Sequence, residues 1–215
     1  MSIQQHFFPT TIYSLERTEY LTAAREVAED FLNKRRGEIE LNDMYPAYMT
    51  EGIDRDARIA SFVQFVAQLG WEILNEQGYA MDHFNTFFTE MWVQEHHKTS
   101  LMEQHTHGYG AQISGFYFLD CPENSSRAVF YDPKITKSII GLPERDLSKV
   151  TPASNMINFA PKPGTLILTN SWLPHSFTKN MADTPMRFIH FNIGVRRAAA
   201  CVTQCPPQPT VKVIG

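Results

Sequence analysis

Cysteine, positive charge and long apolar runs are all scarce in this 215-residue sequence. The three cysteines, Cys121, Cys201 and Cys205, include no Cys-x-x-Cys pair. We therefore expect reduced thiols in a reducing compartment, with a Cys201–Cys205 bridge or metal clip as the alternative. The net charge is -4 and the longest basic run is Lys34-Arg-Arg36, so the sequence predicts no basic face for nucleic acid.

No apolar stretch approaches the about 18 residues of a membrane span, and the N-terminus lacks the basic and apolar regions of a signal peptide. We expect a soluble protein of the cytoplasm, or of the host cytoplasm if the source is a virus, with no membrane partner and no evident nucleic-acid partner. With 43% apolar and 12% aromatic residues, the chain can bury one substantial core. The prediction is a single domain over 1–197, followed by a proline-containing arm over 198–215 that could support a homodimer.

The first third of the chain has a helical period. Apolar residues recur at helical spacing over residues 15–34 and again over residues 56–77. Asp54 can cap the second helix and Gly78 can end it. The segment 37–52 shows no period and is interpreted as loop. Because neither helix is stable alone, we expect both to brace a sheet, as a helical support over about 15–78.

After Gly78 the sequence changes to short runs rich in aromatic and β-branched residues. Seven runs are predicted strands: 85–94, 111–119, 128–132, 156–159, 165–169, 175–179 and 186–193. With an edge strand near Phe8, these approach the about eight strands of a jelly roll. The predicted fold is mostly β, a jelly-roll core over about 85–195 braced by the N-terminal helices. The connection from Pro133 to Ser154 is long enough to be a lid or a binding loop.

A metal site is the strongest functional signal. His105 and His107 lie two residues apart, so in a strand both imidazoles would leave the same face. His175, which follows a Pro-x-Pro-Gly strand, is the best third ligand. Each of the three could instead be an ordinary polar or surface histidine. His96 and His97 are adjacent and would face opposite ways in a strand, so a solvated turn is the preferred interpretation of that pair.

Arg187 lies twelve residues after His175, in an apolar strand. A guanidinium that faces inward in such a strand needs an anionic partner. Its planar fork can hold a carboxylate with two hydrogen bonds, so Arg187 is the candidate anion-binding residue.

The order of these motifs resembles the iron(II)- and 2-oxoglutarate-dependent oxygenases. The closer resemblance is to a microbial and viral branch with a His-x-His and a Ser-Gly-x-Tyr strand, present here as Ile113-Ser-Gly-Phe-Tyr-Phe-Leu119. Phe8-Pro-Thr-Thr-Ile12 and Met91-Trp-Val93 echo further segments of that branch, so the resemblance covers roughly residues 7 to 195. It implies that His105, His107 and His175 bind iron as the catalytic centre, and that Arg187 binds the distal carboxylate of 2-oxoglutarate.

The chain departs from most relatives at two positions. His107 stands where they have an aspartate ligand, so the site has three imidazoles, with Glu103 as the leading alternative carboxylate. Ile189 replaces a serine that many relatives place beside the arginine. We expect Tyr117, Gln112 or Asn192 to supply the missing hydrogen bond to 2-oxoglutarate.

The leading functional hypothesis is therefore a dioxygenase that uses Fe(II), 2-oxoglutarate and O2 to hydroxylate a C–H bond of a small molecule or of a peptide or protein side chain. A second hypothesis is a cupin-like metalloprotein that does not use 2-oxoglutarate, since His-x-His and Pro-x-Pro-Gly also resemble cupin motifs. A non-catalytic jelly-roll structural or attachment module is the third. Arg187 discriminates between the first two, because a cupin has no particular need for it.

Overall fold

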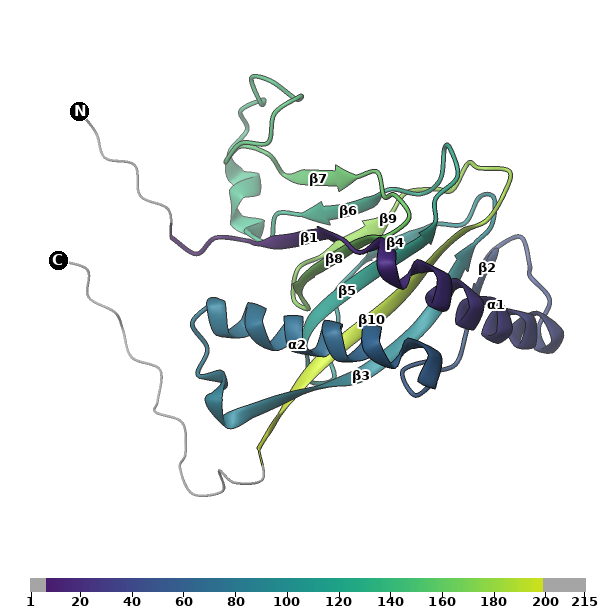
Figure 1. Ribbon diagram of the computed structural model, residues 1–215. Coiled ribbons are helices and arrows are strands. Elements are labelled where there is room, and N and C mark those ends of the chain that lie inside the picture. The colour runs from purple at the N-terminus through teal and green to yellow at the C-terminus, as the bar shows by residue number, and fades with distance from the viewer. Residues whose placement is uncertain (1–6, 199–215) are drawn as a thin grey trace.

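The chain folds into two antiparallel sheets that face each other, with two helices on the outer side of the larger sheet (Figure 1). The structure is a computed structural model, and residues 7–198 of it are described. The strands are β1 (Ile12–Glu16), β2 (Ala47–Met49), β3 (Phe84–His96), β4 (Met102–His105), β5 (Ala111–Asp120), β6 (Ala128–Tyr131), β7 (Met156–Phe159), β8 (Thr165–Asn170), β9 (His175–Phe177) and β10 (Met186–Arg197).

The larger sheet has six strands in the order β1-β8-β5-β10-β3-β2. The smaller sheet has four, in the order β4-β9-β6-β7. All registered pairs are antiparallel, and consecutive strands alternate between the sheets over much of the chain. This arrangement is the predicted jelly-roll fold.

Two helices cover the outer face of the larger sheet: α1 (Leu21–Glu38) and α2 (Ala60–Glu76). Each buries one stripe, which includes Val27 and Leu32 on α1 and Phe62 and Val66 on α2. Because a helix of this length needs an apolar surface to be stable, the sheet and the helices stabilise each other.

Side chains alternate between two cores along the central strands. On β5, Tyr117 and Leu119 face the helices, whereas Phe116 and Phe118 face the smaller sheet. The inner core between the sheets is mostly aromatic, and the rings of Phe177 and Phe188 stack there at 4.8 Å. The direction in which a side chain leaves its strand thus decides whether it meets the helices or the interior of the jelly roll.

The seven predicted strand runs are confirmed, with boundaries that move by a few residues. The loop prediction for 37–52 was wrong in part, because Ala47–Met49 pairs with the end of β3. Strand β4 was not predicted as a separate strand. The prediction that Asp54 caps the second helix was wrong: Asp56 caps the 3-10 turn Ala57–Ile59 that leads into α2, where its side chain accepts a hydrogen bond from the Arg58 backbone, and α2 itself has no side-chain cap. Gly78 does end it, with a φ of +92° that favours glycine.

The long segment between β6 and β7 contains one short 3-10 helix, Ile135–Ile139. The predicted C-terminal arm and the pair Cys201 and Cys205 lie outside the described residues. Cys121 is a free thiol. No helix within residues 7–198 is long and apolar enough to span a membrane.

Candidate metal centre

Three histidines meet at one end of the space between the sheets. His105 is the last residue of β4 and His175 the first of β9, and the two lie opposite each other in the pairing of these strands. His107 belongs to the loop that leads into β5, and its backbone N–H donates to the Ser171 carbonyl. One ring nitrogen from each histidine lies within 4.8 Å of the other two, and no other such group of histidine, cysteine or acidic residues occurs among residues 7–198.

The rings of His105 and His175 are oriented by backbone carbonyls. His105 Nδ1 donates to the Glu103 carbonyl at 2.7 Å, and His175 Nδ1 donates to the Leu173 carbonyl at 3.0 Å. Since a carbonyl can only accept, each Nδ1 carries the proton and each Nε2 keeps a free lone pair. These hydrogen bonds therefore set the tautomer that a metal requires.

His107 is oriented by a side chain instead. Its Nδ1 lies 3.2 Å from the Asn192 amide nitrogen, which also donates to Glu90 at 2.9 Å. The Asn192 oxygen accepts a hydrogen bond from Ser114. His107 Nε2 lies 3.2 Å from His175 Nε2, so the two atoms share one proton that a bound metal would displace.

We expect Asn192→Ala to weaken divalent-metal binding by about ten- to a hundredfold, because it removes the group that holds the His107 ring. Equilibrium titration with Fe(II) or Co(II) measures the change. Ser114→Ala is the matched control, since it removes the hydroxyl behind Asn192 and leaves the contact to His107. Equal affinities in wild type and Asn192→Ala would contradict this role for Asn192.

The surroundings of His107 and His175 favour the neutral imidazole. Burial lowers the pKa of His107 to about 4, and the nearby His105 lowers it further. Burial lowers the pKa of His175 to about 3, against the opposing effect of its hydrogen bond to Leu173. Neutral imidazoles at physiological pH need not lose a charge-stabilised proton before they bind a cation.

Of the other predicted site residues, only Asn192 lies beside the triad. The Glu103 carboxylate is not part of the cluster, and this residue contributes its backbone carbonyl. Tyr117 lies on the helix side of β5, where its hydroxyl donates to the Arg17 carbonyl. Gln112 is exposed at the start of β5.

Arg187 lies on the helix side of β10, opposite the face that carries His190 and Asn192. Its Nε donates to Glu95 at 2.7 Å and its Nη1 to Glu29 of α1 at 2.7 Å. Asp120 is 3.8 Å away. The arginine does need anionic partners, as predicted, but the protein's own carboxylates supply them. The structure therefore does not bring Arg187 to the histidines.

Glu95 is the centre of this ion network, with only 1% of its side chain exposed. Arg36 of α1 donates to it through two nitrogens, and His97 lies 2.9 Å away. Burial pushes the pKa of Glu95 upward, but these hydrogen bonds and the charges of Arg36 and Arg187 outweigh burial and hold the pKa below its ordinary value of 4.5. The network joins α1 to the sheet.

The lowered pKa of Glu95 predicts acid sensitivity. A carboxylate with a depressed folded-state pKa stabilises the protein above its unfolded-state pKa, and this stabilisation is lost as the pH falls through the folded-state value. We expect the free energy of unfolding to fall as the pH drops below about 4.5, the ordinary value for this group. Urea denaturation at a series of pH values measures this, and Glu95→Gln should show a shallower decline. Parallel curves for the two proteins would contradict the assignment.

Three side chains on the inner face of β3 and β10 were missed or misread from the sequence. His96 is fully buried on the inner face and hydrogen-bonded to Gln94 at 3.0 Å, so the solvated-turn interpretation was wrong for it. Trp92 and His190 also face the interior, with ring centroids 4.5 Å apart. The sequence did contain a signal for these side chains. Polar or hydrogen-bonding residues alternate in Trp92-x-Gln94-x-His96 and in His190-x-Asn192, which predicts a polar stripe on one face of each strand. The sequence does not say that this face is the inner one.

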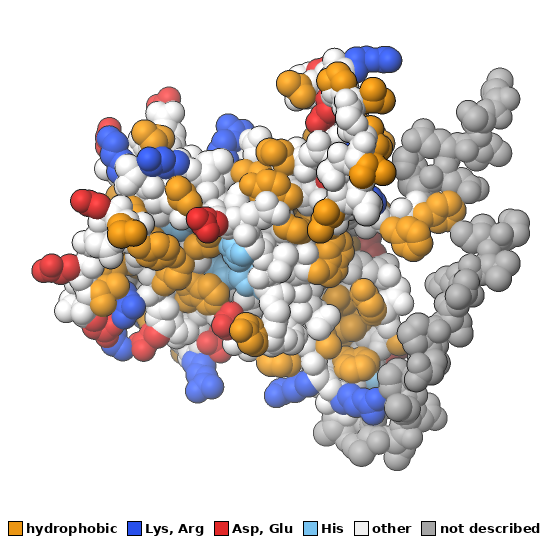
Figure 2. Space-filling model, turned by 180° about the vertical axis from the view of Figure 1, so that it is seen from behind, with side chains coloured by type: hydrophobic (Ala, Val, Ile, Leu, Met, Phe, Trp, Pro, Cys, Tyr) orange, Lys and Arg blue, Asp and Glu red, His pale blue; other side chains and the backbone are white. Residues whose placement is uncertain are grey.

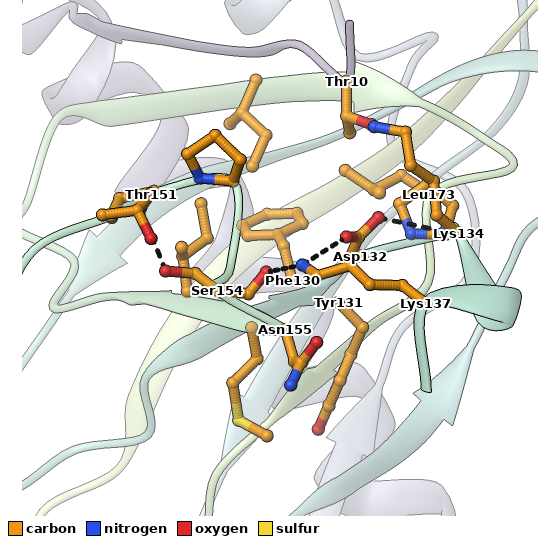
Figure 3. A pocket seen from close by; sticks show the side chains of 16 residues that line it. Thr10, Phe130, Tyr131, Asp132, Lys134, Lys137, Thr151, Ser154, Asn155 and Leu173 are labelled. Carbon is orange, nitrogen blue, oxygen red and sulfur yellow. Dashed lines mark hydrogen bonds and ion pairs between the residues drawn. The ribbon is translucent and has the colours of Figure 1, made fainter. Parts of the chain in front are cut away.

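One hollow reaches the triad, and a second is lined by residues that contact His175. A groove of about 630 Å³ ends at His105 and is lined by Met44, Tyr45, Leu101 and neighbouring residues. The space-filling view shows histidine side chains at the surface with hydrophobic side chains around them (Figure 2). A second hollow, of about 420 Å³, lies under the segment between β6 and β7 and is lined by Leu173 and Phe130 (Figure 3).

Lys137 holds the second hollow closed on one side. Its Nζ donates to the Asp132 carboxylate at 2.9 Å and to the Ser154 carbonyl at 2.6 Å (Figure 3). This ion pair joins the two ends of the segment between β6 and β7, which is predicted to be a lid or binding loop. Leu173, whose carbonyl accepts the hydrogen bond from His175, also lines this hollow.

The sequence of residues 90–192 matches the family described as "Putative 2OG-Fe(II) oxygenase". No curated protein matches the chain significantly. Among solved structures, AviO1 from Streptomyces viridochromogenes superposes with a TM-score of 0.61 at 12% identity, over 93% of each chain. A Pseudomonas putida prolyl-4-hydroxylase gives 0.57 at 11% identity, over 88% of this chain and 94% of that one.

A viral collagen prolyl hydroxylase from Paramecium Bursaria Chlorella virus-1, solved as a 2OG complex, gives 0.52 at 12% identity, over 85% and 94% of the two chains. At such low identity these likenesses establish the shared fold alone. The matched sequence segment contains all three histidines of the triad.

Proposed function

We propose that this chain, whose residues 90–192 belong to the 2OG-Fe(II) oxygenase family, is an enzyme that binds one Fe(II) through His105, His107 and His175 and oxidises a C–H bond at the expense of 2-oxoglutarate and O2. The observation that carries the proposal is the convergence of three ring nitrogens within 4.8 Å inside the matched segment. Three imidazoles that leave open coordination positions are a donor set that suits iron.

In this proposal each protein group has a separate task. The two hydrogen bonds to backbone carbonyls present Nε2 of His105 and His175, and Asn192 holds His107. Iron with bound 2-oxoglutarate supplies the oxidising chemistry, in which the 2-oxo acid loses CO2 and the substrate gains oxygen. The aromatic residues around the triad, among them Phe116 and Phe130, exclude bulk water from one side of it.

The substrate enters by the groove that ends at His105. Met44 on its wall is 95% exposed, and Tyr45 and Leu101 are each about half exposed. Exposed apolar side chains beside a reactive centre favour a substrate with an apolar part, either a small molecule or a peptide side chain.

One observation favours the cupin-like alternative, a metalloprotein of the same fold that does not use 2-oxoglutarate. The only arginine that the sequence offered as a receptor for the distal carboxylate already binds Glu29 and Glu95. The cupin-like alternative therefore differs from the oxygenase in one measurable property, which is affinity for 2-oxoglutarate.

Anaerobic titration of the metal-free protein with Fe(II), followed by 2-oxoglutarate, tests the proposal. We expect one iron per chain and then a visible metal-to-ligand charge-transfer band when the 2-oxo acid chelates the iron. His83→Ala, which changes an exposed histidine outside the triad, should behave as wild type. Iron binding without any band on addition of 2-oxoglutarate would support the cupin-like alternative.

A further inference from the structure

Buried nitrogen atoms without partners lie on the inner face of β3 and β10, next to the triad. Within residues 7–198, they are Nε1 of Trp92, Nδ1 of His96, and both Nδ1 and Nε2 of His190. In the pairing of the two strands His190 lies opposite Trp92, and Met186 opposite His96. A buried polar group without a hydrogen bond costs free energy, so the unpartnered nitrogens of the adjacent Trp92 and His190 rings point to a ligand.

His190 lies at the centre of this group. It is 1% exposed, and its ring centroid is 4.7 Å from that of His107, a member of the triad. The Gly115 carbonyl is close enough to affect the ring but does not meet hydrogen-bond geometry. A neutral imidazole offers one donor and one acceptor, and neither ring nitrogen of His190 has a partner.

We propose that His190 and Trp92, and not Arg187, bind the distal carboxylate of the 2-oxo acid in this chain. The inference rests on the proposed function. Trp92 Nε1–H and one N–H of His190 would each donate to a carboxylate oxygen. Hydrogen bonds to an ionised acceptor are roughly twice as strong as neutral ones, and burial strengthens them further. Trp92 is partly buried, although its Nε1 atom is not accessible to solvent.

The surroundings of Arg187 support the same assignment. Its guanidinium lies within 4 Å of the carboxylates of Glu29, Glu95 and Asp120. A further dianion there would have to displace carboxylates that already pair with the guanidinium, one of them the buried Glu95. No lysine or arginine of the described chain is among the fully buried residues. The groups on the inner face of β3, β5 and β10 near the triad include Asn192, His190, Trp92 and Ser114.

Two probes separate recognition of the distal carboxylate from binding to the metal. 2-Oxoglutarate carries that carboxylate, whereas pyruvate is a 2-oxo acid without it. The measurement is the dissociation constant of each acid from the anaerobic Fe(II) protein, read from the charge-transfer band, and it requires no turnover. Wild type should bind 2-oxoglutarate more tightly than pyruvate.

His190→Phe and Trp92→Phe each remove donor nitrogens and keep an aromatic ring in the aromatic core. Each should weaken 2-oxoglutarate binding by roughly ten- to a hundredfold and leave pyruvate nearly unchanged, so that the preference collapses. Iron content shows whether each variant is folded. If His190→Phe does not fold, the dissociation constants of Trp92→Phe test the inference. Trp71→Phe is the matched control, because Trp71 donates to the Met81 and Phe84 carbonyls on the far side of the sheet.

Arg187→Gln tests the competing assignment, in which Arg187 binds the distal carboxylate. We expect this variant to keep the preference for 2-oxoglutarate over pyruvate. Loss of the preference in Arg187→Gln together with its retention in His190→Phe and Trp92→Phe would overturn the inference and leave the proposed function intact. Absence of the band in wild type that has bound iron would overturn both.

Discussion

His175→Ala is expected to abolish Fe(II) binding, with a loss of affinity of about a hundredfold or more. Binding free energies of metal sites are of the order of 10 kcal/mol shared among a few ligands, so one ligand of three contributes several kcal/mol. His175 is also the most buried member of the triad, so water cannot readily replace it. Metal analysis after anaerobic dialysis measures the loss.

The same experiment on His107→Ala and His105→Ala tests the three-histidine assignment. Both variants should lose iron, whereas Glu103→Gln should keep it, because the Glu103 carboxylate is outside the cluster. Full iron occupancy in His107→Ala would contradict the assignment, and iron loss in Glu103→Gln would then identify Glu103 as the carboxylate ligand.

Arg187→Ala is expected to lower the free energy of unfolding by about 2–3 kcal/mol. Loss of one partner from a buried ion pair typically costs about 3–5 kcal/mol, because a buried charge is left behind. The estimate is lower here because Arg36 and His97 continue to pair with Glu95. Urea denaturation measures the change.

Arg25→Ala is the matched control for Arg187→Ala. Arg25 of α1 pairs with Asp120 at 3.1 Å, but its side chain is 44% exposed. An exposed ion pair contributes about 0–1 kcal/mol, so Arg25→Ala should change stability less than Arg187→Ala does. Equal stabilities of wild type and Arg187→Ala would mean that the network around Glu95 does not hold α1 to the sheet.

The sequence located Arg187 in its strand but did not determine which groups its side chain contacts. The sequence places an arginine twelve residues after His175 in an apolar strand, and both features are present in the structure. The guanidinium nevertheless points to α1, whereas His190, three residues later, points to the triad. Side chains separated by an odd number of residues in a strand leave opposite faces of the sheet. The predicted role of Arg187 required its side chain to leave the face of the triad, and the distance in sequence from His175 did not specify this face.

Local patterns in the sequence determined most of the secondary structure. The helical period predicted α1 and α2, and β-branched and aromatic runs predicted seven strands, because these patterns reflect which face each element buries. Strands β2 and β4 were not predicted, because their three and four residues are too few to show alternation. Histidine spacing also predicted the triad, although His107 belongs to a loop and not to a strand.

Only the tertiary structure decided which side chains share the interior with the triad. His96, Trp92 and His190 lie on strands that are distant in sequence and adjacent in the sheet, and their meeting depends on the register between β3 and β10. The sequence determined that this chain has a jelly-roll pattern and three candidate ligands. The pairing register, which is set by packing over the whole sheet, decided that Arg187 meets carboxylates of α1 and β3 and that His190, in contact with Trp92, lies next to the triad.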